Sequence, residues 1–110
     1  MRASAGFVLS ACLLAGCASA DDRKIEAMVA DRMGAVTSMS RPVIYRQDDV
    51  KKVCVIVHYN NEWGEPMPPV AVIGWYVFRS ETWHTDNPRE IDESFDCAQY
   101  AAEHGQILEG

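Results

Sequence analysis

The first part of the chain after Ser19 has the apolar spacing of a helix. From Asp21 onward, apolar residues recur every three or four positions, which is the period of one helix face. They are Ile25, Met28, Val29, Met33, Val36 and Met39. Asp21 or Asp22 can cap the helix start, and the helix must end before Pro42 because the residue before a proline is pushed out of the α region. The pattern predicts an amphipathic helix that ends before Arg41-Pro42.

The middle of the chain has a composition that is typical of strands. Residues 43–46, 50–60 and 70–79 are rich in β-branched and aromatic side chains. Both faces of the two long segments are apolar, so we expect them to be covered on both sides. If both helices pack on one face, the other face becomes an apolar patch for a partner or for a homodimer. One helix on each face is the alternative.

A turn around residues 84–90 precedes a second predicted helix, which begins either at Pro88 with Asn87 as its cap or near Asp92. Its thin apolar stripe consists of Phe95, Ala98, Ala101 and Ala102. The order helix, strands, helix predicts a small single α+β domain. It has an N-terminal amphipathic helix, an antiparallel sheet of about three strands and a C-terminal helix clamped by a disulfide.

The N-terminus is that of an exported protein. Arg2 is followed by an uncharged segment, residues 3–16, which is too short to span a bilayer and has the layout of a secretory signal. The sequence Leu14-Ala15-Gly16-Cys17 resembles the lipobox of bacterial lipoproteins. That resemblance implies cleavage before Cys17, a diacylglyceryl group on its thiol and an acylated amine. Ala18, where an Asp would favour the inner membrane, implies the periplasmic face of the outer membrane. The alternative is an ordinary signal cut after Ala20, which would leave a soluble periplasmic protein.

The resulting organisation is a signal peptide over residues 1–16, a lipidated tether over 17–22 and one domain over 23–110. Cys12 leaves with the signal and Cys17 carries lipid, so Cys54 and Cys97 remain. Two thiols in an oxidising compartment are most simply one disulfide.

The charge distribution argues against a nucleic-acid partner. Residues 17–80 contain eight acidic and eight basic side chains, whereas residues 81–110 contain eight acidic side chains and only Arg89 as a cation. Nucleic-acid binding needs a basic footprint, which this distribution lacks.

The sequence shows no catalytic pattern. His58, His84 and His104 fall on three different predicted elements and have no ligand spacing. The acidic side chains between Glu90 and Asp96 are too close along one segment to form an opposed acid and base. We therefore predict no catalytic residue, no metal, no cofactor and no enzyme activity.

The connection between the two long strands, residues 60–70, carries Trp63, Met67 and three prolines. Prolines stiffen a loop by fixing φ, and tryptophan is a preferred interface anchor. We expect a binding or accessory module that contacts another envelope protein through this loop or through an apolar sheet face. The alternative is a ligand carrier or enzyme with a pocket between sheet and helix, lined by Trp75, Tyr76 and Trp83.

Overall fold

The computed structural model describes residues 20–109, which form two helices and seven strands. In chain order the elements are α1 (Ala20–Met33), β1 (Val36–Met39), β2 (Val43–Gln47), β3 (Val50–Tyr59), β4 (Val70–Val77), β5 (Thr82–Thr85), β6 (Arg89–Glu90), α2 (Cys97–His104) and β7 (Gln106–Glu109).

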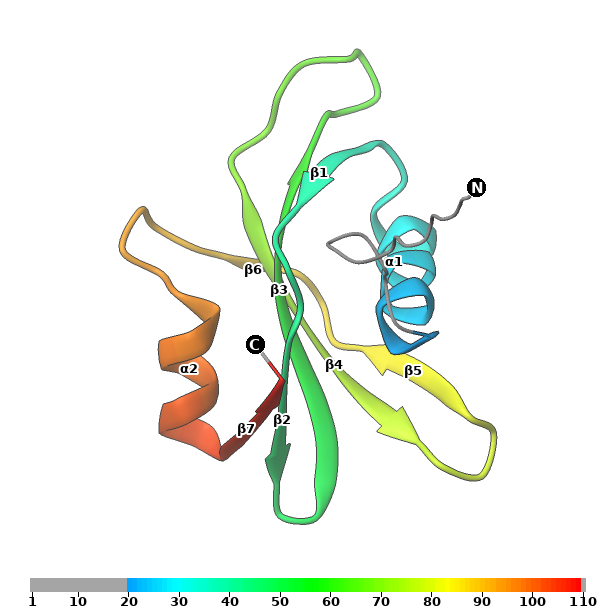
Figure 1. Cartoon of the computed structure of the whole chain (residues 1–110). Coiled ribbons are helices and arrows are strands. Elements are labelled where there is room, and N and C mark those ends of the chain that lie inside the picture. The colour runs from blue at the N-terminus through cyan, green and yellow to red at the C-terminus, as the bar shows by residue number, and fades with distance from the viewer. Residues whose placement is uncertain (1–19, 110) are drawn as a thin grey trace, which may run out of the picture.

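The two longest strands, β3 and β4, form the centre of one antiparallel sheet (Figure 1). The order across the sheet is β5-β4-β3-β2-β7. β1 and β2 follow one another along the same edge of β3, where β1 pairs with its later residues and β2 with its earlier ones. β5 and β6 share the outer edge of β4 in the same way. Each long strand therefore has two short strands along its outer edge.

This architecture corrects the predicted fold class. The domain is mostly β, with seven strands instead of about three, so the expectation of an α+β domain is wrong. The three predicted strands are present as β2, β3 and β4. The four missed strands have two to four residues each, too few to show a period. β1 pairs with β3, β5 and β6 pair with β4, and β7 pairs with β2, so each short strand forms where a neighbouring strand offers unpaired backbone groups.

The boundaries of both helices also differ from the expectation. α1 ends at Met33, where Gly34 takes a φ of +80° and donates its N–H to the carbonyl of Ala30 at 2.9 Å. Helices commonly end at a glycine in the left-handed backbone conformation, and the residues beyond Gly34 form β1. Residues 20–22, assigned to the tether, lie in the first turn of α1. α2 starts later than either predicted position, since Asp96 caps it by accepting the N–H of Ala98 at 2.9 Å.

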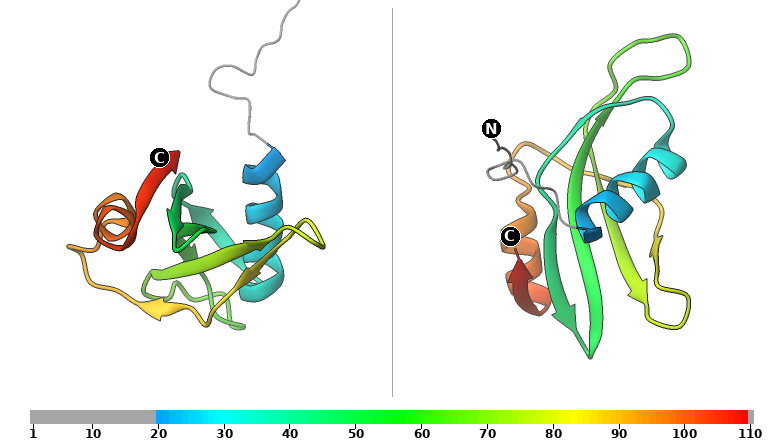
Figure 2. Two further views of the ribbon diagram at one scale, coloured as in Figure 1. Left: turned by 90° about the horizontal axis from the view of Figure 1, so that it is seen from below. Right: turned by 45° about the vertical axis from the view of Figure 1, so that its right-hand side comes forward.

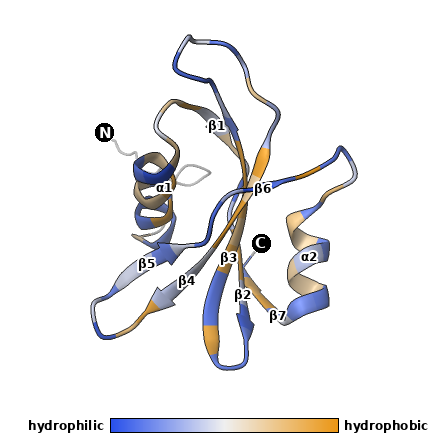
Figure 3. Cartoon of the chain, turned by 180° about the vertical axis from the view of Figure 1, so that it is seen from behind, coloured by the Kyte–Doolittle hydropathy of each residue, from blue (hydrophilic) through white to orange (hydrophobic). Residues whose placement is uncertain are grey.

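One helix covers each face of the sheet, so neither face is left without a helix (Figure 2). α1 buries Ile25 and Val29 against Val53, Val55 and Val57 of β3. α2 lies on the opposite face, where Cys97 and Ala101 pack with Cys54, Tyr45 and Ile73. Figure 3 shows that hydrophobic residues concentrate on the central strands and hydrophilic ones on the turns.

Two glycines allow backbone to approach closely at the points where helices meet the sheet. A Cβ at Gly74 in β4 would lie 2.6 Å from the carbonyl oxygen of His84 and 3.1 Å from Cε of Met28 on α1. A Cβ at Gly105, directly after α2, would clash with the carbonyl oxygen of Arg46. A side chain at Gly105 would therefore push β7 away from β2.

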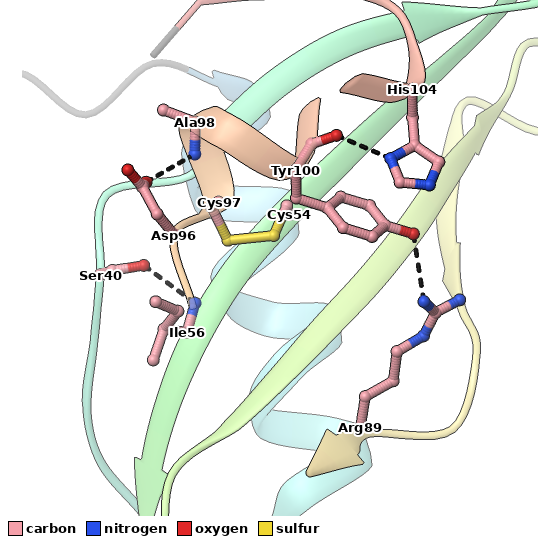
Figure 4. Close-up of a disulfide and its surroundings, with 9 residues drawn as sticks. All are labelled: Ser40, Cys54, Ile56, Arg89, Asp96, Cys97, Ala98, Tyr100 and His104. Atoms are coloured by element: carbon pink, nitrogen blue, oxygen red, sulfur yellow. Dashed lines mark hydrogen bonds between the residues drawn. A yellow bond between two sulfur atoms is a disulfide. The ribbon is translucent and has the colours of Figure 1, made fainter. Parts of the chain in front are cut away.

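The predicted disulfide is confirmed. Cys54 of β3 and Cys97 at the start of α2 are bonded, with Cα atoms 5.5 Å apart (Figure 4). Further along α2, the ring of Tyr100 stacks on His104 and its hydroxyl accepts a hydrogen bond from Arg89 at 3.1 Å. The disulfide therefore fixes the N-terminal end of α2, and the contacts of Tyr100 fix its later turns.

Candidate binding site at the tip of the β3–β4 connection

The connection between β3 and β4 has a tip that is organised by the side chain of Asn61. Its Oδ1 accepts the backbone N–H groups of Trp63 and Glu65, both at 2.9 Å. Its Nδ2 donates to Oε1 of Glu65 at 2.9 Å. The backbone of Asn61 bonds to Glu65 and Gly64 as well, and Gly64 takes the positive φ that the turn requires. Asn favours such turns because its side chain mimics a backbone acceptor.

Trp63 lies at this tip and is 77% exposed, the largest exposure of any large hydrophobic residue described. Its neighbours Glu62 and Glu65 are also exposed. The tip therefore presents an indole ring and two exposed carboxylates on a turn held by five hydrogen bonds to or from Asn61.

Met67 does not share the tip with Trp63. It lies at the base of the connection, half-buried, and its N–H donates to the carbonyl of Tyr59 at 2.9 Å. It borders a cavity of about 270 Å³ together with Tyr59, the two prolines that follow it, and Ile91. The structure thus separates the two residues that the sequence grouped: Trp63 is exposed at the tip, whereas Met67 packs at the base.

The three aromatic residues predicted to line a pocket, Trp75, Tyr76 and Trp83, belong to two separate ring pairs. Tyr76 and Trp83 have centroids 5.3 Å apart, and Trp75 stacks on His84 with centroids 6.0 Å apart. Trp75 and Trp83 both border a cavity of about 460 Å³ between α1 and β5, and Tyr76 does not. Residues of α1 that border it include Met28, Asp31 and Arg32.

Two of the polar groups at this cavity are not free to bind a solute. The indole Nε1 of Trp83 is buried and has no hydrogen-bond partner within residues 20–109. Because that atom is shielded from solvent, it is not available to a solute in the cavity. Arg32 is already hydrogen bonded to the side chain of Asn87.

A third aromatic feature was missed by the sequence reasoning. Phe78, directly after β4, is 70% exposed, and its ring meets Tyr76 edge-on at a centroid distance of 5.0 Å. Lys51 lies over the same group, with its Nζ 5.5 Å from the Tyr76 centroid and 5.9 Å from the Trp83 centroid. The position of Phe78 at the end of an apolar strand gave no signal that it would be exposed. Asn61 was missed as well, although the spacing Asn-x-x-Gly is a recognisable turn signal.

Several titratable side chains of residues 20–109 take part in local contacts. No group of three or more His, Cys, Asp or Glu side chains there could hold a metal ion. The hydroxyl and the N–H of Ser94 donate to the carboxylate of Asp92 and lower its pKa. This carboxylate therefore stabilises a local turn. His84 contacts Trp75, and His104 bonds to the carbonyl of Tyr100 at 2.7 Å.

The lipobox and Cys17 lie outside the described residues. No helix within residues 20–109 is both long enough and apolar enough to cross a bilayer. The chain matches no protein-family model, no curated protein and no solved structure. Function is therefore argued from the geometry of the domain and from the N-terminal sequence.

Proposed function

We propose that this protein is a lipoprotein anchored through Cys17 to the periplasmic face of the outer membrane, and that it binds another envelope protein through Trp63. The observation that carries the binding proposal is a 77% exposed tryptophan on a tip fixed by Asn61. The lipobox supports the anchor and the compartment.

A rigid tip favours binding over a merely tolerated surface residue. Association costs free energy when loops and side chains must be ordered, and a backbone that is already held avoids part of that cost. Tryptophan is enriched among residues that dominate interface energetics, because its large ring fills a pocket while its N–H donates a hydrogen bond.

The charges around Trp63 indicate what the partner offers. Glu62 and Glu65 are close to Trp63 in the chain and are exposed. An apolar pocket with basic side chains at its rim would complement both the indole and the carboxylates. We therefore propose a protein partner with such a pocket.

The cavity beside α1 supports a second candidate, a carrier of a small ligand. Its volume of about 460 Å³ is within the usual size of ligand sites. The Nε1 of Trp83 is buried and Arg32 is paired with Asn87, so neither is free to hold a ligand, which is why we favour the tip. A carrier predicts that Trp75→Ala loses ligand and Trp63→Ala does not.

Photo-crosslinking in intact cells tests the proposal, with a photoreactive residue at position 63 and a matched one at exposed Glu109. We expect one discrete adduct at 63 and none at 109, and its mass spectrum identifies the partner. With that partner purified, Trp63→Ala should weaken binding roughly 30-fold, the effect of losing about 2 kcal/mol at a dominant contact. Adducts of the same pattern at both positions, or no adduct at 63 in folded protein, would contradict the binding site.

A further inference from the structure

The turn that joins β4 to β5 presents an exposed aromatic side chain on a fixed backbone. Phe78 is 70% exposed, and the N–H of Glu81 donates to its carbonyl at 3.3 Å to close the turn. The hydroxyls of Ser80 and Thr82 are 2.6 Å apart at the same turn. Behind it, Tyr76 and Trp83 form an aromatic cluster with Phe78 at its outer end. An exposed aromatic joined to such a cluster is a candidate interaction surface.

Phe78 lies at the same end of the domain as the first turn of α1. Lys51 forms a salt bridge with Asp21 of that turn, with Nζ 2.7 Å from Oδ2, and the same Nζ lies over Tyr76. Tyr76 in turn contacts Phe78. Figure 1 and the right-hand view of Figure 2 agree with this chain of contacts. They place the β4–β5 turn at the end where α1 begins, and the β3–β4 connection at the opposite end.

The length of chain before α1 limits how far this end can be from a lipid anchor. Three residues lead from Cys17 to Ala20. At a maximum of about 3.6 Å per residue they span roughly 11 Å. If Cys17 carries lipid, as the proposed function holds, the first turn of α1 is held next to the headgroup layer.

We infer that the end of the domain that carries Phe78 rests on the lipid bilayer, with the ring of Phe78 inserted into the interfacial layer. This inference rests on the proposed lipid anchor at Cys17. The turn carries one cationic side chain, Arg79, and one anionic side chain, Glu81. Because these charges balance, the contact does not depend on anionic lipid. Aromatic rings at the membrane interface are a recurrent means of fixing orientation. The orientation also places Trp63 away from the bilayer, where a protein partner can reach it.

Depth-dependent fluorescence quenching tests this orientation in the lipidated, full-length mature protein. One variant carries Phe78→Cys and the matched control carries Trp63→Cys, each labelled with the same environment-sensitive fluorophore. Cys54 and Cys97 are bonded to one another and buried, so the label reacts with the introduced thiol. The proteins are reconstituted into phosphatidylcholine vesicles with and without a lipid that carries a quencher in its upper acyl chain.

We expect the label at position 78 to lose most of its emission in quencher vesicles and the label at position 63 to lose none. An unquenched label at 78 on protein that floats with the vesicles overturns the inference and leaves the anchor intact. Quenching at 63 instead overturns the orientation and the proposed protein-binding tip together. A Cys17→Ala variant that floats like the parent protein shows that lipid on Cys17 is not the anchor, which overturns the anchor and this inference.

Discussion

The two faces of the sheet hold their helices by different means. α1 has fourteen residues and buries Ile25 and Val29 in an aliphatic layer with the valines of β3. α2 has eight residues and buries Cys97 and Ala101, a cysteine and a methyl group. Burial of apolar area stabilises by about 25 cal/mol per Å², so the second face gains far less from its helix. On the α2 face, the disulfide and the partly buried ring of Tyr100 make up for the smaller buried apolar area.

Removal of the disulfide should have the largest effect on stability among the changes that test this difference between the two faces. The two cysteines are 43 residues apart, and loop-closure entropy for that span corresponds to about 4 kcal/mol. The double variant Cys54→Ala, Cys97→Ala should lose about that much free energy of unfolding, measured by urea denaturation. Hydrogen exchange should show that α2 loses protection well before α1. Uniform loss of protection in both helices would show that α2 does not depend on the bond.

Truncation of Ile25 tests the opposite face. This side chain is fully buried, and Ile→Ala in a core costs 2–5 kcal/mol, so we expect about 3 kcal/mol. The exposed neighbour Glu26 provides the control, since Glu26→Ala should change stability by less than about 0.5 kcal/mol. Exchange protection should fall in α1 and persist in α2, because the disulfide still holds the second helix. The idea fails if Ile25→Ala weakens both helices equally.

Alkaline pH offers a smaller, selective effect on the α2 face. Burial raises the pKa of Tyr45 from 10.0 to about 12, the nearby Tyr100 adds to the rise, and Arg89 opposes it. The unfolded chain ionises this phenol first, so its contribution is fully present below pH 10 and is lost as the pH rises through about 12. At about 1.36 kcal/mol per pKa unit, the loss is at most about 2.7 kcal/mol.

Stability measured between pH 9 and 12.5 should therefore fall more steeply for the parent protein than for Tyr45→Phe, which keeps the ring and lacks the hydroxyl. Parallel curves for the two proteins would show that Tyr45 ionises as a free phenol does.

The sequence predicted the long elements because each is long enough to show a period. The segments around Val55 and Val72 were expected as strands and are β3 and β4. The helix that begins near Asp21 was also expected, but its end was misplaced because Val36 and Met39 continue the helical spacing by chance. Gly34 ends the helix through its positive φ, which apolar spacing does not show.

The short strands could not be predicted from their own residues. β7 carries Ile107 and Leu108 on four exposed positions, and it is a strand because Gly105 lets the backbone turn in beside Arg46. Such pairing is decided by tertiary context. The disulfide was predicted from the number of remaining cysteines and the oxidising compartment alone, because Cys54 and Cys97 were the two thiols left.

The candidate site was partly predictable for the same reasons. Trp63 was selected because prolines stiffen its loop and tryptophan is a preferred interface anchor, and it is exposed. Trp75, Tyr76 and Trp83 were grouped by type, yet their rings fall into two pairs whose members come from β4 and β5. The pairing of β4 with β5 decides this grouping, and β5 had not been foreseen.

The disulfide also divides the folded chain into a covalent ring and two arms. The ring runs from Cys54 to Cys97 and contains most of β3, all of β4, β5 and β6, and the Trp63 tip. One arm carries α1, β1, β2 and the start of β3; the other carries the rest of α2 and β7. A pull between the N-terminal arm and Trp63 loads the first arm and the ring, and the C-terminal arm bears no tension. Under such a force the first arm can be drawn out to its full length, whereas the ring limits how far the rest of the chain can follow.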